Sequence, residues 1–181
     1  MAQHILLLRG INIGSRNRLS MPQLRHALTA AGFADVRTYL QSGNVVLSTV
    51  GKPEEVARNV EGLIAQEFSL EIAVIARTRA QLAKVVELNP LARIAKNAKR
   101  YQVTFLAERP PRDVVRRVEQ TAKSSERVII DGREIYAWHP EGVARSQLWA
   151  LLAGKQLGAT ATSRNWTTVT KLLDLADVRD R

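Results

Sequence analysis

One β-hairpin is predicted by the stretch Val36-Arg37-Thr38-Tyr39-Leu40-Gln41-Ser42-Gly43-Asn44-Val45-Val46-Leu47-Ser48. Its two strands, Val36–Leu40 and Val45–Ser48, are rich in β-branched and aromatic residues, which favour extended backbone. Gly43-Asn44 supplies the residues that tolerate the positive φ of a tight turn. The hairpin lies between two segments of helical character, so an α+β fold is indicated.

Helices flank this hairpin on both sides. Ser20-Met21-Pro22-Gln23 has the form of a capping box with proline in the first turn, and apolar residues at helical spacing follow it. Pro53-Glu54-Glu55 begins the second helix, with acids at its positive end. Strands are predicted at His4–Leu8 and Glu71–Arg77. The resulting order, β-α-β-β-α-β, is that of a ferredoxin-like unit.

The same order returns after residue 100. Tyr101–Phe105 alternates between apolar and polar residues, as a half-buried strand does. Asp131-Gly132 predicts the turn of a second hairpin. The remaining predicted elements are a helix from Pro110, strands at Val128–Ile130 and Ile135–Trp138, a helix at Ser146–Ala153, a loop at Gly154–Ser163 and a last helix from about Trp166 to Ala176.

The prediction is therefore an α+β fold with two tandem, duplicated ferredoxin-like βαββαβ units, antiparallel sheets and an extra C-terminal helix. The first unit takes residues 1–78 and the second takes residues 101–181. Residues 79–100 form a helical connector, which begins at a capping box, Thr78-Arg79-Ala80-Gln81.

Composition narrows the classes of function. The chain of 181 residues has no cysteine, so disulfides, thiolate nucleophiles and cysteine metal sites are excluded. Its apolar runs are shorter than the ~20 residues of a membrane helix, and no secretion signal precedes the first strand. We expect a cytoplasmic protein without a membrane partner, and the sequence predicts no cofactor.

Positive charge is the main asymmetry of the sequence. The formal net charge is +10, and residues 1–34, 88–107 and 142–173 contain basic residues but no acid. Such tracts suit a partner that carries phosphate. The alternative is that the charge only keeps the protein soluble.

The sequence resembles one bacterial family over almost its whole length, and the resemblance is carried by three stretches. They are Leu8–Gly14 (Leu-Arg-Gly-Ile-Asn-Ile-Gly), Tyr39–Val46 (Tyr-Leu-Gln-Ser-Gly-Asn-Val-Val) and Arg164–Leu172 (Arg-Asn-Trp-Thr-Thr-Val-Thr-Lys-Leu). The sequence resembles domain of unknown function 1697. The resemblance implies a tandem ferredoxin-like fold and no particular reaction. It also implies a second glycine where Ser15 stands, so this loop departs from the family pattern.

The same three stretches hold the candidate anion-binding residues. Glycines allow backbone N–H groups to approach an anion, and arginine and amide side chains add donors. We expect the stretches to converge into one basic cleft. The candidate residues are Arg9, Asn12, Gly14, Gln41, Ser42, Asn44, Arg164 and Asn165.

Several of the candidates also have a plain structural explanation, although a turn does not account for Gln41 and Ser42. Gly43 and Asn44 suit a hairpin turn, and Asn165 suits the N-cap of the last helix. Arg164 would then be a cation at a helix N-terminus, where the helix dipole disfavours it. An anion or a buried acid beside Arg164 would remove that penalty.

No motif in the sequence predicts catalysis. His4, His26 and His139 lack the spacing of metal ligands, so no metal site is predicted. His139-Pro140 is interpreted as a turn, and no pair of neighbouring acids indicates general acid–base chemistry.

Three functions remain open. The first is binding of nucleic acid or a phosphate-bearing small molecule, although the first hairpin lacks the aromatic residues on which RNA bases stack. Tyr101, Phe105, Tyr136 and Trp138 offer aromatic rings in the second half, where they also suit a core. The second is a small-molecule enzyme acting on a phosphate- or carboxylate-bearing metabolite. The third is a non-catalytic scaffold, a homo-oligomer paired through sheet edges.

Overall fold

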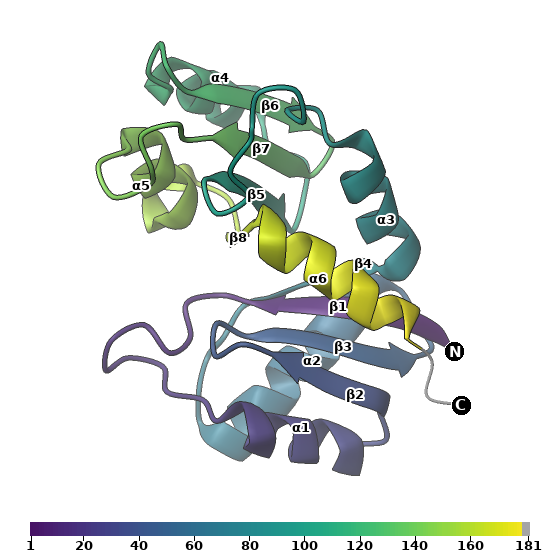
Figure 1. Ribbon diagram of the computed structural model, residues 1–181. Helices are drawn as coiled ribbons and strands as arrows, with labels where there is room; N and C mark the ends of the chain where they lie inside the picture. The colour runs from purple at the N-terminus through teal and green to yellow at the C-terminus, as the bar shows by residue number, and fades with distance from the viewer. Residues whose placement is uncertain (179–181) are drawn as a thin grey trace. The chain divides into compact units, whose positions relative to one another are not determined.

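The computed structural model describes residues 1–178, which divide into two compact units. Unit 1 comprises Met1–Lys84 and the C-terminal residues from Lys171 onward, and unit 2 comprises Val85–Thr170. Each unit contains one four-stranded antiparallel sheet (Figure 1). The sequence-based boundaries after residues 78 and 100 stay a prediction.

Unit 1 has the predicted element order. Its sheet runs β2-β3-β1-β4, with all neighbours antiparallel, and α1 and α2 lie together on one face (Figure 1). The elements are β1 (Ala2–Leu8), α1 (Met21–Ala30), β2 (Ala34–Tyr39), β3 (Asn44–Thr49), α2 (Pro53–Phe68) and β4 (Val74–Thr78).

The core of unit 1 lies between the sheet and these helices. Leu6 and Leu8 of the central strand β1 are fully buried and belong to one cluster with Leu24 of α1 and Ile64 of α2. Ile5 and Leu7, which alternate with Leu6 and Leu8, are buried as well, so β1 is apolar on both faces. The apolar residues that recur at strand or helix spacing in the sequence are thus the ones that form the core of unit 1.

Local capping chemistry was predicted correctly. The Ser20 hydroxyl accepts a hydrogen bond from the Gln23 backbone N–H at 3.4 Å. Thr78 and Gln81 bond reciprocally at 2.9 and 3.1 Å and begin α3 (Arg79–Leu88). Capping depends only on residues three apart, so sequence alone identifies it.

Unit 2 repeats the architecture. Its sheet runs β6-β7-β5-β8, which is the same arrangement as β2-β3-β1-β4 in unit 1. The predicted duplication of a ferredoxin-like unit is therefore confirmed. The elements are β5 (Tyr101–Leu106), α4 (Arg112–Thr121), β6 (Arg127–Asp131), β7 (Glu134–Trp138), α5 (Gln147–Ala153), a short 3₁₀ helix η1 (Lys155–Leu157) and β8 (Ala161–Asn165), followed by α6 (Trp166–Asp177), which continues into unit 1.

One strand was missed from the sequence. The loop predicted over Gly154–Ser163 contains the start of β8, which pairs antiparallel with β5 so that Arg164 lies opposite Val103. Ala-Thr-Ser-Arg-Asn shows no apolar alternation, so its sequence does not predict a strand. The strand forms because its backbone pairs with β5, and its own sequence does not reveal that pairing.

No helix among residues 1–178 is long and apolar enough to cross a membrane.

Candidate functional site

A basic loop follows β1 in unit 1. Residues 10–19 fold back on themselves, with a hydrogen bond of 3.0 Å from the Asn12 N–H to the Asn17 carbonyl and one of 3.3 Å from the Arg16 N–H to the Ile13 carbonyl. We call residues 10–19 the basic finger. In Figure 1 it extends beyond the end of the unit 1 sheet.

Asn12 holds the base of the basic finger. Its amide nitrogen donates to the carbonyls of Leu19 at 2.9 Å and Gln41 at 2.7 Å, and its amide oxygen accepts from the Leu19 N–H at 2.9 Å. Asn12 has a φ of 53°, a left-handed conformation that asparagine tolerates. The side chain therefore ties the start of the finger to its end and to the β2–β3 turn.

The β2–β3 turn approaches the finger closely through Gly43. The Gly43 carbonyl accepts from the Leu8 N–H at 2.8 Å, and its φ is 86°. A Cβ at Gly43 would lie 2.7 Å from the Cδ1 of Ile11 and 2.8 Å from the Cβ of Leu8. Glycine is required here both by backbone conformation and by space.

The side chain of Asn44 is buried beneath that turn. Its amide nitrogen donates to the Tyr39 carbonyl at 2.8 Å and to the Ser42 hydroxyl at 3.1 Å. These contacts stabilise the turn from inside. Gln41 and Ser42 are exposed beside it.

The structure thus brings together the first two predicted polar stretches. Asn12 joins them directly through Gln41, while Gly14 lies exposed on the finger and Arg9 is half-buried where β1 ends. Anion binding by these residues remains a prediction.

Most of the third stretch, residues 164–170, belongs to unit 2. Asn165 caps α6, because its side-chain oxygen accepts from the Thr168 N–H at 2.9 Å. Arg164 directly precedes this N-cap, as predicted, but it also belongs to β8, a strand that the sequence did not predict. Its guanidinium donates to the Thr162 hydroxyl and the Ser163 carbonyl, each at 2.8 Å. Burial lowers the pKa of Arg164 to about 10, so it stays charged at neutral pH. Convergence of all three stretches into one cleft remains a prediction.

The tip of the basic finger exposes positively charged side chains to solvent. Arg16 and Arg18 are exposed, and so are their neighbours Ser15 and Asn17. Ile13 is 69% exposed at the same tip. Residues 1–34 contain no acid, so no carboxylate of this segment neutralises the two arginines.

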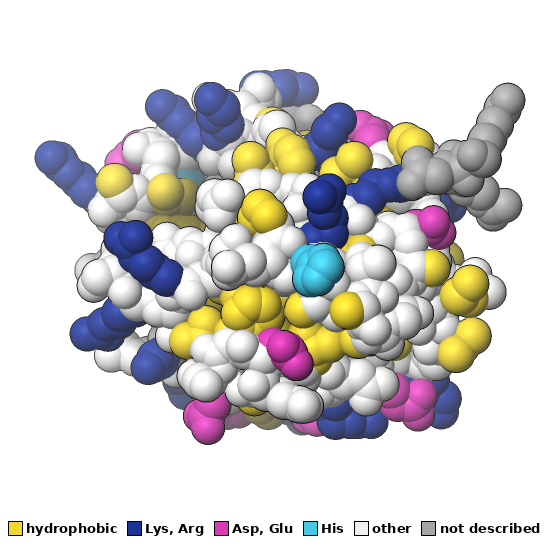
Figure 2. Space-filling model, turned by 90° about the horizontal axis from the view of Figure 1, so that it is seen from below, with side chains coloured by type: hydrophobic (Ala, Val, Ile, Leu, Met, Phe, Trp, Pro, Cys, Tyr) yellow, Lys and Arg dark blue, Asp and Glu magenta, His cyan; other side chains and the backbone are white. Residues whose placement is uncertain are grey.

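A second surface feature of unit 1 is apolar. Between α1 and α2 there is a hollow of about 800 Å³, and Figure 2 shows hydrophobic side chains gathered in it. Its lining includes Ala27, Ala31, Leu63 and Phe68 but no lysine or arginine. This hollow does not suit an anion.

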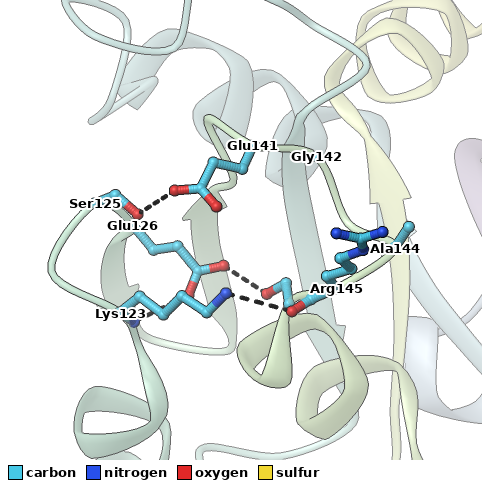
Figure 3. Close-up of a pocket in the computed structure, with 8 residues that line it drawn as sticks. Lys123, Ser125, Glu126, Glu141, Gly142, Ala144 and Arg145 are labelled. Atoms are coloured by element: carbon cyan, nitrogen blue, oxygen red, sulfur yellow. Dashed lines mark hydrogen bonds between the residues drawn. The ribbon is translucent and has the colours of Figure 1, made fainter.

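Unit 2 has a polar pocket of about 330 Å³. It lies where the turn after α4 meets the segment before α5 (Figure 3). Lys123 and Arg145 contribute cations, and Glu141 accepts a hydrogen bond from Ser125 at 3.3 Å. Glu126 and Ser146, both buried, complete the polar lining.

Beneath this pocket, three buried side chains form a carboxylate cluster: Glu126, His139 and Ser146. The Glu126 Oε1 lies 2.8 Å from the His139 Nδ1 and accepts from the Ser146 hydroxyl at 2.5 Å. Its Oε2 accepts from the Lys123 N–H at 3.0 Å. Burial raises the pKa of Glu126, but the bonds from Ser146, the Lys123 N–H and His139 outweigh it, so the pKa lies below its ordinary value.

The carboxylate cluster is not arranged as a nucleophilic triad. The Ser146 hydroxyl and Glu126 both lie on the Nδ1 side of His139, at 3.1 and 2.8 Å, whereas a triad uses the two ring nitrogens separately. The Ser146 oxygen also accepts from the Trp149 N–H at 3.0 Å and caps α5. The cluster therefore stabilises the turns around the pocket.

Sequence reasoning missed this cluster. The turn predicted at His139-Pro140 is present, since the His139 carbonyl accepts from the Gly142 N–H at 2.9 Å. The sequence did not show that the His139 side chain is fully buried and bonded to Glu126. The only local signal was Ser146, an N-cap residue before a leucine-rich helix. Among the described residues, no group of three or more His, Asp or Glu side chains is placed to hold a metal ion.

Comparison with known proteins agrees with this architecture. The family model described as "Protein of unknown function (DUF1697)" matches residues 1–136. The chain belongs to the DUF1697 family. This match includes the basic finger and the β2–β3 turn of unit 1.

A solved structure shares the fold of this DUF1697 chain. It is a conserved bacterial protein, SP0830 from Streptococcus pneumoniae, with 22% identity and a TM-score of 0.81. The similarity covers 97% of this chain and 99% of that one. Comparison with curated proteins found no match.

Proposed function

We propose that this DUF1697 protein binds nucleic acid through the basic finger of unit 1. One observation carries the proposal: a braced loop presents exposed Arg16 and Arg18 within an acid-free segment. Its support comes from Asn12, whose side chain ties both ends of the loop to the β2–β3 turn.

Bracing favours binding because it reduces the entropy lost on association. A loop already held in one conformation loses less freedom when it binds, so more of the electrostatic attraction appears as affinity. Arginine forms paired hydrogen bonds with phosphate oxygens, which suits the two exposed guanidinium groups. The net charge of +10 adds long-range attraction to a polyanion.

Binding of this kind recognises the phosphate backbone rather than the base sequence. Tyr101, Phe105 and Tyr136 are buried, and Tyr101 stacks on Trp166 with ring centroids 4.7 Å apart. These rings do not present a surface for base stacking. We therefore expect weak dependence on sequence and strong dependence on salt. A cytoplasmic location, which the sequence predicts, would place RNA within reach.

Replacing both Arg16 and Arg18 with alanine is expected to weaken binding of single-stranded RNA and duplex DNA about tenfold or more. On duplex DNA, each lost phosphate contact should also reduce the steepness of log K against log salt by about 0.9. The slope of the double variant should therefore be shallower by about 2. Fluorescence anisotropy titrated with salt measures both quantities.

The matched control removes two exposed arginines from α4 in unit 2. Arg112→Ala with Arg116→Ala lowers the net charge equally but leaves the basic finger intact. It should retain most of the affinity. Equal losses in both double variants would show that only total charge matters, and an absence of binding by the unaltered protein at low salt would refute the proposal.

A second candidate function is binding of a small phosphate- or carboxylate-bearing molecule in the unit 2 pocket. The pocket volume of about 330 Å³ lies at the lower end of the usual range for ligand sites. Lys123 and Arg145 on its rim are the groups that would hold the anion.

Titration with inorganic phosphate or acetate at constant ionic strength tests this candidate. Amide chemical shifts in an NMR spectrum should change at residues 123–126 and 142–146, and Arg145→Ala should reduce the affinity about tenfold through loss of a charged hydrogen bond. Arg116→Ala is the control. Changes spread over all basic residues, or unaffected by Arg145→Ala, would exclude a specific site.

A further inference from the structure

Strand β6 forms an open edge of the unit 2 sheet. Among the described strands it pairs only with β7, and its residues alternate between exposed and half-buried. Arg127, Ile129 and Asp131 are the exposed members, with Ile129 38% exposed. Val128 and Ile130 point to the other face and pack on the core with α4 and α5.

The hairpin register shows which backbone groups of β6 face outward. Asp131 and Glu134 flank a two-residue turn, Gly132-Arg133, whose first residue has a φ of 57°. In such a turn the flanking residues form a hydrogen-bonded pair, and bonded and non-bonded pairs then alternate along the ladder. Asp131, Ile129 and Arg127 therefore direct their backbone groups toward β7. Val128 and Ile130 direct theirs toward the open edge.

We propose that β6 is a dimerisation surface that pairs antiparallel with β6 of a second copy of this chain, about a two-fold axis at Ile129. In this register, Val128 of one copy faces Ile130 of the other. Both residues have outward backbone groups, so the two symmetric pairs make four N–H···O=C hydrogen bonds. The two four-stranded sheets become one sheet of eight strands.

Charge complementarity selects this register and this partner. Arg127 of one copy lies opposite Asp131 of the other, and the symmetry supplies the same pair twice. These are non-hydrogen-bonded pairs, in which side chains approach more closely. The Arg127 guanidinium also donates to the carbonyls of Ser124 at 2.7 Å and Glu126 at 2.8 Å, which holds it at the start of β6. A shift by two residues would break both ion pairs.

The apolar residues fit the same arrangement. The Ile129 side chains of the two copies meet at the axis and cover each other, which removes exposed apolar surface from water. Val128 and Ile130 extend the apolar layer of each unit across the junction. An edge that served only to repel other strands would carry charge at its centre.

Charge reversal tests the pairing. Sedimentation equilibrium of the full chain should show a monomer–dimer equilibrium in the micromolar to millimolar range expected for a small interface, with Kd about 10–100 μM. Asp131→Arg places like charges opposite each other twice, and should weaken the dimer about 10- to 30-fold. Arg127→Asp should do the same. The double variant, Arg127→Asp with Asp131→Arg, restores opposite charges and should regain most of the affinity.

Ile129→Lys gives an independent measurement, because it places two ammonium groups at the axis without altering the hairpin turn. It should abolish the dimer while leaving the circular dichroism spectrum unchanged. A protein that stays monomeric up to about 1 mM overturns the proposal. The binding free energy of such a dimer would be weaker than ~4 kcal/mol. A dimer unaffected by Ile129→Lys, or one that the double variant fails to restore, overturns it as well. Dimerisation is measured without nucleic acid, so its outcome is separate from that of the RNA titration.

Discussion

Replacing Gly43 with alanine is expected to lower the free energy of unfolding of unit 1 by about 3–4 kcal/mol, the sum of a left-handed backbone cost and a steric cost. The new Cβ would lie 2.7 Å from Ile11 Cδ1 and 2.8 Å from Leu8 Cβ, closer than real Cβ contacts. Leu8 lies in the central strand and cannot move without disturbing the core. Urea unfolding, followed through amide exchange of β1 and β3, measures the loss.

Gly32 provides a matched control in the same unit. Its φ is 91°, close to the 86° of Gly43, but a Cβ there would have no neighbour within 4 Å. Gly32→Ala should therefore cost only the backbone term, about 1 kcal/mol. Equal losses at the two positions would show that the contact with Leu8 and Ile11 contributes nothing.

Replacing Glu126 with glutamine is expected to destabilise unit 2 by about 3 kcal/mol at pH 7, because hydrogen bonds to a buried charged group are worth about 1.5–3 kcal/mol each. The carboxylate accepts from Ser146, His139 and the Lys123 N–H. A glutamine amide has only one acceptor oxygen, so at least one of these donors is left buried without a partner. Thermal unfolding followed by circular dichroism measures the change.

The stabilisation by Glu126 also depends on pH. The folded-state pKa of Glu126 lies below its ordinary value, so the carboxylate contributes stability above the ordinary glutamate pKa of about 4.3. That contribution is lost as the pH falls through the folded-state pKa. The difference between the unaltered protein and Glu126→Gln should therefore be largest at neutral pH and shrink as the pH falls below about 4.3.

Glu119 on α4 supplies the control for Glu126. It is exposed, so Glu119→Gln should change stability by less than about 0.5 kcal/mol at any of these pH values. A Glu126→Gln variant as stable as Glu119→Gln would mean that the carboxylate cluster does not hold the turns together. A constant difference across the pH range would contradict the lowered pKa.

The two surfaces of this DUF1697 chain are proposed for different tasks. The basic finger belongs to unit 1 and the β6 edge to unit 2. A dimer through β6 would give each assembly two basic fingers, and two linked sites bind a polyanion more tightly than one. Nucleic-acid affinity should then fall in the Ile129→Lys variant only where the unaltered protein is dimeric.

Part of the candidate site could be read from the sequence. Gly43 was predicted correctly as a turn residue of positive φ, and Asn165 as an N-cap, because these roles depend on the residue and its immediate neighbours. The same prediction was wrong for Asn44, which is the first residue of β3, while Leu40 takes the other positive φ of the turn. The bracing role of Asn12 was not predicted. Its amide bonds the Gln41 carbonyl 29 residues away, and no local pattern indicates which carbonyl it will meet.

Fold class followed from the sequence alone, since apolar periodicity, turn residues and caps act within a few residues and define each helix and strand. The repeated order of these elements was enough to predict two ferredoxin-like units. Tertiary structure alone decided three things: the polar strand β8, the carboxylate cluster formed by Glu126, His139 and Ser146, and the open edge at β6. Each depends on which distant backbone or side chain lies alongside, and that is set by the packing of the whole unit rather than by any one stretch of residues.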